Sequence, residues 1–301
     1  MLETVVATIS LRHPVMNASG ILGTHREHIS RLVSYGLAAV VTKTIIPEPR
    51  EGYSPPIIVE LPTGGLINAV GLENPGKNII RELVEEAKKY GTPIIVSIGG
   101  RNEDEFIEAA VEADMNKADA VELNLSCPHT KGYGVEIGVD PKNVYSVVRA
   151  VVSTIKIPVV AKLGLSDRVV ESAEKALEAG AKGLTLINTI KAIYIDVYSL
   201  KPVLTNIYGG LSGTPIHPIA VRIVYDVYKE TKADIIGCGG VVNWQTAAEM
   251  ILAGAKAIQV GTALMRDPKR IVEDIVKGLS EWLETIGMKE ITQAVGLAHK
   301  V

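Results

Sequence analysis

Short apolar runs rich in β-branched residues alternate with helical stretches along the whole chain, and this alternation constrains the fold more than any other feature. Most of these runs are nearly all apolar, rather than apolar only at every second position. The eight candidate strands are residues 15–18, 39–43, 94–98, 120–125, 159–162, 183–188, 234–238 and 257–261. Continuous apolar runs of this length are typical of parallel strands buried on both faces. Eight βα units predict an α/β fold, a closed (β/α)8 or TIM barrel rather than an open sheet.

The helical stretches between the runs carry recognisable end signals. Asn243 can cap a helix over residues 244–252, and Asp267 followed by Pro268 predicts a helix from about 269 to 285. The segments Ala-Gly-Ala-Lys at 179–182 and 253–256 each stand between a helix and a strand. They indicate the same αβ unit used twice, with glycine ending the helix.

Two connections are too long for bare βα loops: residues 44–76, after the second strand, and residues 189–213, after the sixth. The second contains alternating stretches at 192–198 and 202–207. Connections of this length usually have a function. We expect them to lie over the mouth of the barrel, as lids or as subunit contacts. No linker divides the chain, so we expect one domain over residues 1–301.

Composition excludes several classes of protein. A net charge of −3 without a dense Lys/Arg block argues against nucleic-acid binding. No secretory signal is evident at the N-terminus. No apolar run approaches the ~18 residues of a membrane helix. Two cysteines indicate a reducing compartment, the cytoplasm, and are too few for an iron–sulfur cluster, which takes about four thiolates. The histidines show no metal-ligand spacing, so we expect no metal site.

The strand ends carry the candidate chemistry, because catalytic groups of a barrel gather at the carboxyl ends of its strands. Lys43 and Lys162 end apolar strands, where a bound anion or an electron-rich ring would suit them, although each could instead pair with a carboxylate or reach solvent. Asn68, Asn124 and Asn188 offer amides suited to a planar ligand with several C=O and N–H groups. Glycines follow the last two strands, at 239–240 and 261, and predict a backbone phosphate site beside the helix starting near Asn243.

Cys127 lies where the fourth strand opens into a glycine-rich loop. A free cysteine is commonly a small buried hydrophobe. At a strand end facing a ligand, however, a thiol can be half exposed and reactive. His129, two residues further on, could modulate that thiol. Position alone leaves the two interpretations of Cys127 open.

Nine short segments occur in the order of one known family. They are NASG at 17–20, TKT at 42–44, EPREG at 48–52, INAVGLENPG at 67–76, NLSCP at 124–128, AKLG at 161–164, LINT at 186–189, GGLSG at 209–213 and VGTA at 260–263. From about residue 14 to 299 the chain resembles the catalytic subunit of class 1 dihydroorotate dehydrogenases, FMN-dependent enzymes of de novo pyrimidine (UMP) synthesis. The EPREG and GGLSG segments look most like the NAD-linked class 1B type.

The resemblance implies a site at the barrel mouth. It places FMN against Ser19, Lys43, Thr44, Ser97, Asn124, Lys162, Ile187, Gly213, Gly239, Gly240, Gly261 and Thr262. It places dihydroorotate against Lys43, Asn68, Ala69, Val70, Gly71, Leu72, Asn124, Asn188 and Thr189. It makes Cys127 the general base that removes the C5 proton while the C6 hydride passes to flavin N5. Two positions depart from the family pattern: His129 and Ser97 each stand where an asparagine is usual.

The resemblance also implies partners. A class 1B subunit forms a homodimer core within a heterotetramer, and an FAD and 2Fe-2S subunit passes the electrons to NAD+. Two alternatives stay open. The same reaction could use fumarate or another acceptor in a homodimer, or the chain could be a non-redox phosphate-binding barrel such as a lyase or isomerase.

Overall fold

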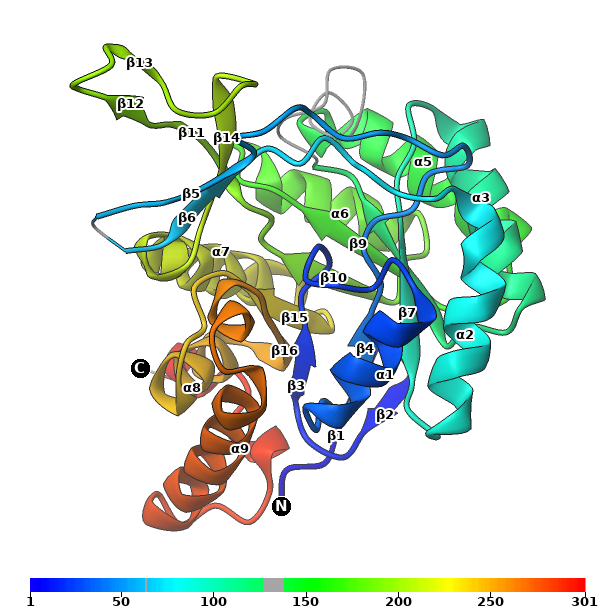
Figure 1. The fold of residues 1–301 in the computed structure, drawn as a ribbon. Coiled ribbons are helices and arrows are strands. Elements are labelled where there is room, and N and C mark those ends of the chain that lie inside the picture. The colour runs from blue at the N-terminus through cyan, green and yellow to red at the C-terminus, as the bar shows by residue number, and fades with distance from the viewer. Residues whose placement is uncertain (63, 127–137, 301) are drawn as a thin grey trace.

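Eight parallel strands form a nearly closed barrel (Figure 1). A computed structural model describes residues 1–62, 64–126 and 138–300. The barrel strands are β3 (Val15–Asn17), β4 (Val40–Val41), β7 (Ile94–Ile98), β8 (Ala120–Asn124), β9 (Val159–Leu163), β10 (Gly183–Leu186), β15 (Ile235–Cys238) and β16 (Ala255–Val260). In the order β3-β16-β15-β10-β9-β8-β7-β4, each strand from β4 to β15 lies beside the next barrel strand in the chain, and β16 lies beside β3. The predicted TIM barrel is therefore confirmed, and each of its strands overlaps one predicted run.

The seam between β3 and β4 is joined largely by one side chain. The Asn17 side chain accepts a hydrogen bond from the Val41 N–H at 2.9 Å and donates one to the Val41 carbonyl at 2.7 Å. One backbone bond, from the Ala38 N–H to the Val15 carbonyl, also crosses this seam at 2.9 Å. Asn17 is completely buried, so water cannot replace its partners.

Asn17→Leu is expected to destabilise the protein by about 2–4 kcal/mol, because it leaves a buried N–H and a buried C=O of Val41 without partners. Urea denaturation of the purified protein measures the effect. Asn206→Leu is the matched control, because Asn206 makes its hydrogen bond to Tyr208 at an exposed turn. Equal losses in the two variants would contradict the role assigned to the seam.

Helices cover the outside of the barrel (Figure 1). They are α1 (Arg26–Ser34), α2 (Ile80–Lys89), α3 (Glu103–Met115), α5 (Pro141–Thr154), α6 (Val169–Glu178), α7 (His217–Thr231), α8 (Trp244–Ala253) and α9 (Pro268–Thr285). The predicted caps are confirmed: Asn243 accepts from the Thr246 N–H, and Asp267 accepts from the Arg270 N–H. None of the helices in the described part of the chain is long and apolar enough to cross a membrane.

A hairpin of β1 (Thr4–Val6) and β2 (Ile9–Leu11) covers the amino-terminal end of the barrel. Its turn residues Ala7 and Thr8 both have positive φ, as a two-residue hairpin turn requires. Val6 and Ile9 pack with residues of the barrel strands in one apolar cluster. The hairpin therefore closes the amino-terminal end of the barrel, and a ligand can enter only at the carboxyl-terminal end.

The two long connections build a second sheet together. β5 (Ile58–Glu60) and β6 (Leu66–Asn68) come from the first connection, and β11 (Ile190–Ile193) and β14 (Tyr208–Ser212) from the second. They pair antiparallel in the order β11-β14-β6-β5. The alternating stretch at 202–207 is mostly a turn, since Ile207 has positive φ and its N–H bonds the Leu204 carbonyl.

A hairpin of β12 (Ile195–Asp196) and β13 (Lys201–Pro202) projects from this small sheet, and we call residues 193–202 the arm (Figure 1). Its apolar side chains are exposed: Val197 by 73%, Tyr198 by 94% and Leu200 by 81%. Monomeric proteins seldom expose apolar residues in such a group.

Candidate functional site

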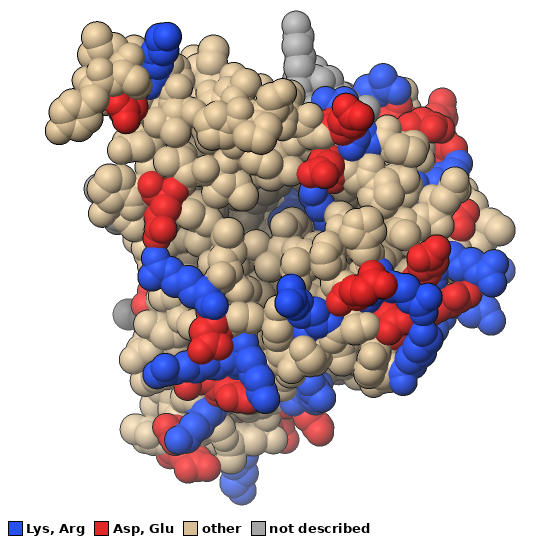
Figure 2. Space-filling model, in the orientation of Figure 1, with Lys and Arg blue, Asp and Glu red and all other residues tan. Residues whose placement is uncertain are grey.

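A cavity of about 610 Å³ opens at the carboxyl ends of the barrel strands, and Figure 2 shows the hollow in this face of the molecule. Its volume lies within the range of roughly 300–1,000 Å³ usual for cofactor and substrate pockets. Most residues that the sequence singled out line it: Ser19, Lys43, Thr44, Asn68, Val70, Gly71, Leu72, Asn124, Lys162, Ile187, Asn188, Thr189, Gly213, Gly239, Gly240, Gly261 and Thr262. The structure thus brings together side chains from both insertions and from the strand ends.

Four of the singled-out residues are not on the described wall. Ser97 is completely buried and lies behind Thr44, whose hydroxyl is 3.1 Å from its own. Ala69 is also completely buried and packs with Ile67 and Leu204 in the small sheet. Cys127 and His129 lie outside the described residues.

Glycines shape one end of the cavity. Gly240 follows β15 with a φ of +68°, and a Cβ there would lie 2.7 Å from both the Gly213 carbonyl oxygen and the His217 Cβ. A side chain is therefore excluded, and the backbone N–H groups can approach a ligand closely. His217, the first residue of α7, lies behind this turn with Nδ1 2.9 Å from the Gly239 carbonyl oxygen. At the same end, Thr262 donates to the Ser212 hydroxyl at 2.8 Å.

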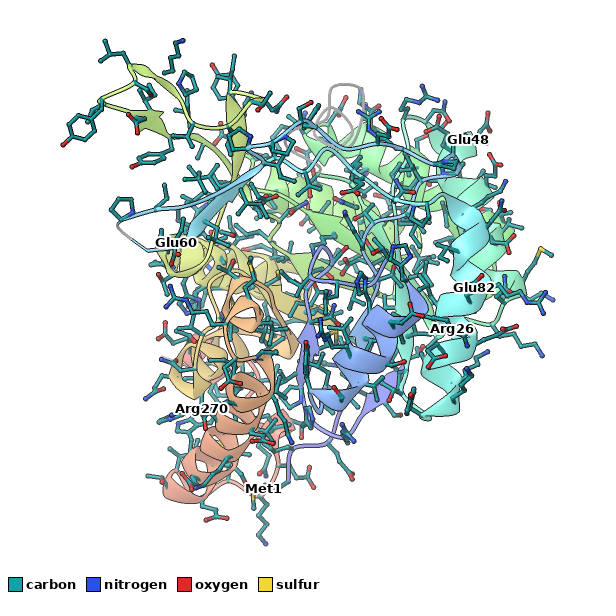
Figure 3. The ribbon with its side chains drawn as sticks, in the orientation of Figure 1. Met1, Arg26, Glu48, Glu60, Glu82 and Arg270 are labelled. Carbon is teal, nitrogen blue, oxygen red and sulfur yellow. The ribbon has the colours of Figure 1, made fainter. Side chains whose placement is uncertain are left out.

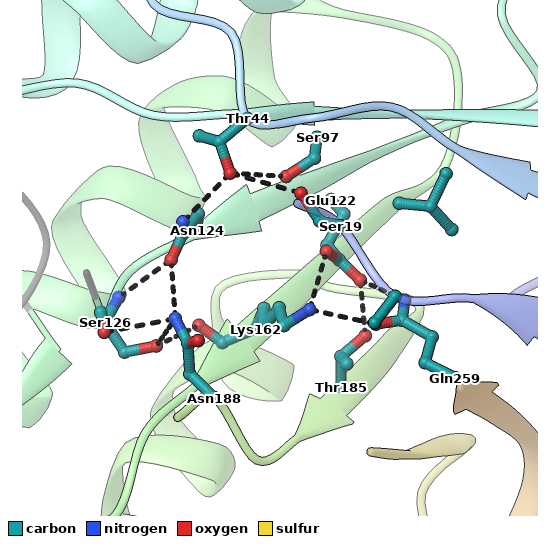
Figure 4. Close-up of polar contacts among 12 residues, drawn as sticks. Ser19, Thr44, Ser97, Glu122, Asn124, Ser126, Lys162, Thr185, Asn188 and Gln259 are labelled. Carbon is teal, nitrogen blue, oxygen red and sulfur yellow. Dashed lines mark hydrogen bonds and ion pairs between the residues drawn. The ribbon is translucent and has the colours of Figure 1, made fainter. Parts of the chain in front are cut away.

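Amides and hydroxyls form a network along the opposite part of the wall (Figure 4). The Thr44 hydroxyl lies 3.2 Å from that of Ser19 and accepts from the Asn124 amide at 3.0 Å. The Asn188 amide donates to the Asn124 side-chain oxygen and to Ser126, each at 3.1 Å. These bonds fix the orientation of each asparagine, so the wall presents defined donors and acceptors to a ligand.

Lys43 is a largely buried cation on the cavity wall. Its ammonium lies 3.7 Å from the Glu73 carboxylate, which is itself 61% exposed. Burial lowers the pKa of Lys43, and Glu73 opposes that shift only in part. A poorly compensated lysine in a pocket favours an anionic ligand group.

Lys162 has a buried partner that the sequence did not reveal. Glu122, also on the inner face of the barrel, is 0% exposed and its Oε1 lies 3.4 Å from the Lys162 Nζ. The partner is thus a carboxylate of the chain, one of the alternatives open at the outset. The only signal was a charged residue inside the apolar run at 120–125, since glutamate is rarely buried unless paired.

An ion pair joins two segments at the rim of the cavity. Glu60, at the end of β5 (Figure 3), forms an ion pair with Arg266 of the segment that leads into α9. Arg266 and Met265 also line the cavity, although neither was singled out from the sequence. The small sheet therefore forms one side of the mouth and the segment before α9 another.

This fold and site define a class: (β/α)8 barrels with a pocket at the carboxyl ends of their strands, lined by glycine turns at one end and by polar side chains elsewhere. Comparison with known proteins narrows the class. The family model of dihydroorotate dehydrogenase matches residues 1–283. The chain therefore belongs to the dihydroorotate dehydrogenase family, which are oxidoreductases of pyrimidine biosynthesis. The alternative of a non-redox lyase or isomerase is wrong.

Relatives match over nearly their full length. The chain is 46% identical to the dihydroorotate dehydrogenase B (NAD(+)) catalytic subunit of Pyrococcus horikoshii, covering 100% of this chain and 99% of the relative. It is 49% identical to a chain of Aeropyrum pernix named provisionally as dihydroorotate dehydrogenase A (fumarate), covering 99% and 98%. A crystal structure of DHODH from Eimeria tenella with ferulenol superposes with a TM-score of 0.87 at 25% identity, covering 100% of this chain and 89% of that one.

Proposed function

We propose that residues 1–301 form one FMN-binding barrel domain that oxidises (S)-dihydroorotate to orotate in UMP synthesis. The observation that carries this proposal is the cavity. Its wall combines the turn at Gly239 and Gly240, which we call the glycine cradle, with the largely buried cation Lys43 and three asparagines: Asn68, Asn124 and Asn188. A phosphate, a carboxylate and an imide-bearing ring need these groups. The two cysteines suit a reducing, cytoplasmic setting.

The residues present fit FMN. The turn at Gly239 and Gly240 excludes side chains, so its N–H groups are free to hold the phosphate, with Gly213, Gly261 and Thr262 beside them. Ser19, Thr44, Asn124, Lys162 and Ile187 would line the flavin and its ribityl chain. When bound, FMN supplies the acceptor for the hydride that leaves C6 of dihydroorotate.

The substrate part of the cavity is formed by both insertions and by β8. Lys43 would bind the carboxylate of dihydroorotate, because its ammonium is only weakly paired. Asn68, Asn124 and Asn188 would bind the ring amides, and residues 70–72 and Thr189 would enclose the ring. Cys127 would remove the C5 proton as general base, with its thiolate as the acting form. A nucleophilic role is not needed, since no group of the substrate is transferred.

The test is anaerobic. Purified protein should be yellow with one FMN per chain, and dihydroorotate should bleach the flavin absorbance while orotate accumulates. A protein that stays colourless after incubation with FMN, or a flavin that dihydroorotate does not reduce, would overturn the proposed function.

We further propose that electrons leave through a partner subunit carrying FAD and a 2Fe-2S cluster, and pass to NAD+. The relative from Pyrococcus horikoshii, named as the catalytic subunit of an NAD(+) enzyme, supports this. The similarly close relative named for fumarate supports the alternative, a homodimer that reduces fumarate. Purification from the native source with analysis for iron and FAD separates the two: iron and FAD in stoichiometric amounts support the partner subunit, and their absence supports the alternative.

The arm supports an assembly of this chain, because its exposed apolar residues can be buried between subunits. We expect the double variant Val197→Asp/Leu200→Asp to sediment as a single chain in analytical ultracentrifugation, whereas the wild type sediments as a dimer or larger. Ser199→Asp is the matched control, since it adds a charge to the same hairpin without removing an apolar side chain. Dissociation of the control, or an intact double variant, would count against the arm as a contact.

Lys43 predicts a pH dependence of ligand affinity. Burial places the pKa of Lys43 below its usual value of 10.5, so its charge is lost at a lower pH than that of an exposed lysine. Binding of the orotate carboxylate should weaken as the pH rises through this lowered pKa. The dissociation constant of orotate, measured from the flavin spectrum between pH 7 and 10, gives the result. Lys43→Arg should remain flat over this range, since arginine keeps its charge; a flat wild-type profile would contradict the prediction.

A further inference from the structure

A buried polar cluster lies inside the barrel beneath the cavity (Figure 4). Gln259 accepts from the Lys162 Nζ at 2.9 Å and donates to Glu122 Oε2 at 2.6 Å. Thr185 donates to the same Oε2 at 2.8 Å. All four side chains belong to residues that are at most 3% exposed. The cluster takes one side chain from each of β8, β9, β10 and β16.

This cluster stands where a barrel usually has branched apolar side chains. Burying an ion pair rarely stabilises a fold more than apolar residues of the same volume would. Glu122 is also incompletely satisfied, because its Oε1 accepts no hydrogen bond and has only the 3.4 Å ion pair. Stabilisation of the fold therefore does not explain why these polar residues are buried here. Their position relative to the cavity does, because Lys162 lines the cavity whereas Glu122 and Gln259 lie behind it.

The register of the strands sets this arrangement. Glu122 precedes the cavity-lining Asn124 by two residues on β8, so the two side chains share the inner face at successive levels. Lys162 pairs in register with Asn124 on one side and Thr185 on the other. The carboxylate thus lies one level below the ammonium, and the positive end of the pair is directed to the cavity.

We propose that Glu122 is a positioning residue for the flavin reaction: with Gln259 it holds the Lys162 ammonium, charged and fixed, against the flavin. This inference rests on the proposed FMN binding. A fixed cation stabilises reduced flavin, which carries more negative charge than oxidised flavin. Glu122 itself touches neither flavin nor substrate and acts only through Lys162.

The charges around Lys162 predict what removal of Glu122 does. Burial alone lowers the pKa of Lys162, but the negative charges of Glu122 and of Cys238 in its thiolate form oppose this shift, so that the pKa lies above the usual value. Among the described residues, these two are the titratable groups that act on Lys162. Without Glu122 the desolvation dominates, and Lys162 loses its proton at a lower pH.

The experiment measures the two-electron midpoint potential of bound FMN between pH 6 and 9, in wild type, Glu122→Gln and Lys162→Met. At pH 6 we expect Glu122→Gln to match the wild type. At pH 9 it should fall to the Lys162→Met value, at least tenfold less favourable for reduction, or about 30 mV for a two-electron couple. A Glu122→Gln potential that equals or exceeds the wild type at pH 9 would overturn the proposal.

Thr185→Val is the matched control, because it removes one hydrogen bond from the same cluster and leaves every charge in place. Thr185 bonds Glu122 and not Lys162, and its loss leaves the Glu122–Lys162 pair and the Gln259 bond in place, so the potential of this variant should follow the wild type across the pH range. A shift as large as that of Glu122→Gln would assign the effect to packing and overturn the proposal. If FMN does not bind the wild type at all, the proposed function fails instead, so the two failures are distinct.

A second measurement needs no flavin reduction. Either single variant leaves a buried charge without its partner, so both should unfold at lower urea concentration than wild type, and the double variant Glu122→Gln/Lys162→Met should recover part of the loss. This unfolding experiment also tests the proposal if Glu122→Gln alone fails to fold. Losses that simply add in the double variant would show that the two residues are not coupled.

Discussion

Cys127→Ala should lose roughly 10²–10⁴-fold of the rate at which dihydroorotate reduces the flavin, the range that a general base contributes. The loss should be confined to the chemical step, since the alanine removes a proton acceptor and the rest of the pocket stays. Anaerobic stopped-flow absorbance measures the rate of flavin bleaching.

The control for this variant is its own cofactor and ligand binding. Cys127→Ala should retain one FMN per chain, and its dissociation constant for orotate should stay within a few fold of wild type. Cys127→Ser should keep slow activity with an optimum at higher pH, because a hydroxyl is harder to deprotonate than a thiol. Fast reduction in the alanine variant would refute the role of Cys127.

Gly240→Ala should lose FMN. The added methyl would lie 2.7 Å from the Gly213 carbonyl oxygen and from the His217 Cβ, so the turn must move and its N–H groups can no longer converge on the phosphate. Two charge-assisted hydrogen bonds are worth about 3 kcal/mol together, which weakens the affinity roughly 100-fold. Fluorescence titration of the apoprotein with FMN measures this constant.

Gly91→Ala separates crowding from backbone strain. Gly91 has a φ of +61°, close to the +68° of Gly240, but a Cβ there would meet nothing within 4 Å. Both variants therefore bear a similar cost of placing alanine in the left-handed region, about 1 kcal/mol of stability. Only Gly240→Ala should change the affinity for FMN. If Gly91→Ala weakens FMN binding equally, the loss reflects general destabilisation rather than the cradle.

The barrel could be predicted from the sequence because its signal is local. A strand buried on both faces is nearly all apolar, and the runs 94–98 and 159–162 show this directly, since Ser97 and Lys162 are their only polar residues. The small sheet is harder to predict. Its strands are short and only partly buried, and β14 contains Gly209 and Gly210, which are poor indicators of a strand.

The site divides in the same way. Lys43, Asn124 and the glycines after β15 could be predicted, because each stands directly after an apolar run. The cluster under the cavity could not. Gln259 and Glu122 are 137 positions apart in the chain, and no local sequence pattern around either residue indicates that they form a hydrogen bond. Ser97 was placed on the wall by family resemblance, whereas the structure directs its hydroxyl to Thr44.

The shared sheet of the two insertions restricts how this enzyme can be engineered or recombined. Asn68 of β6 pairs with Gly210 of β14, so the first insertion holds a candidate ligand residue through hydrogen bonds to the second. A loop graft that replaces residues 44–76 alone would sever this pairing and leave two strands with open edges. Chimeras with other barrels should therefore exchange residues 44–76 and 189–213 together, because the two segments form one structural unit although they are far apart in the chain.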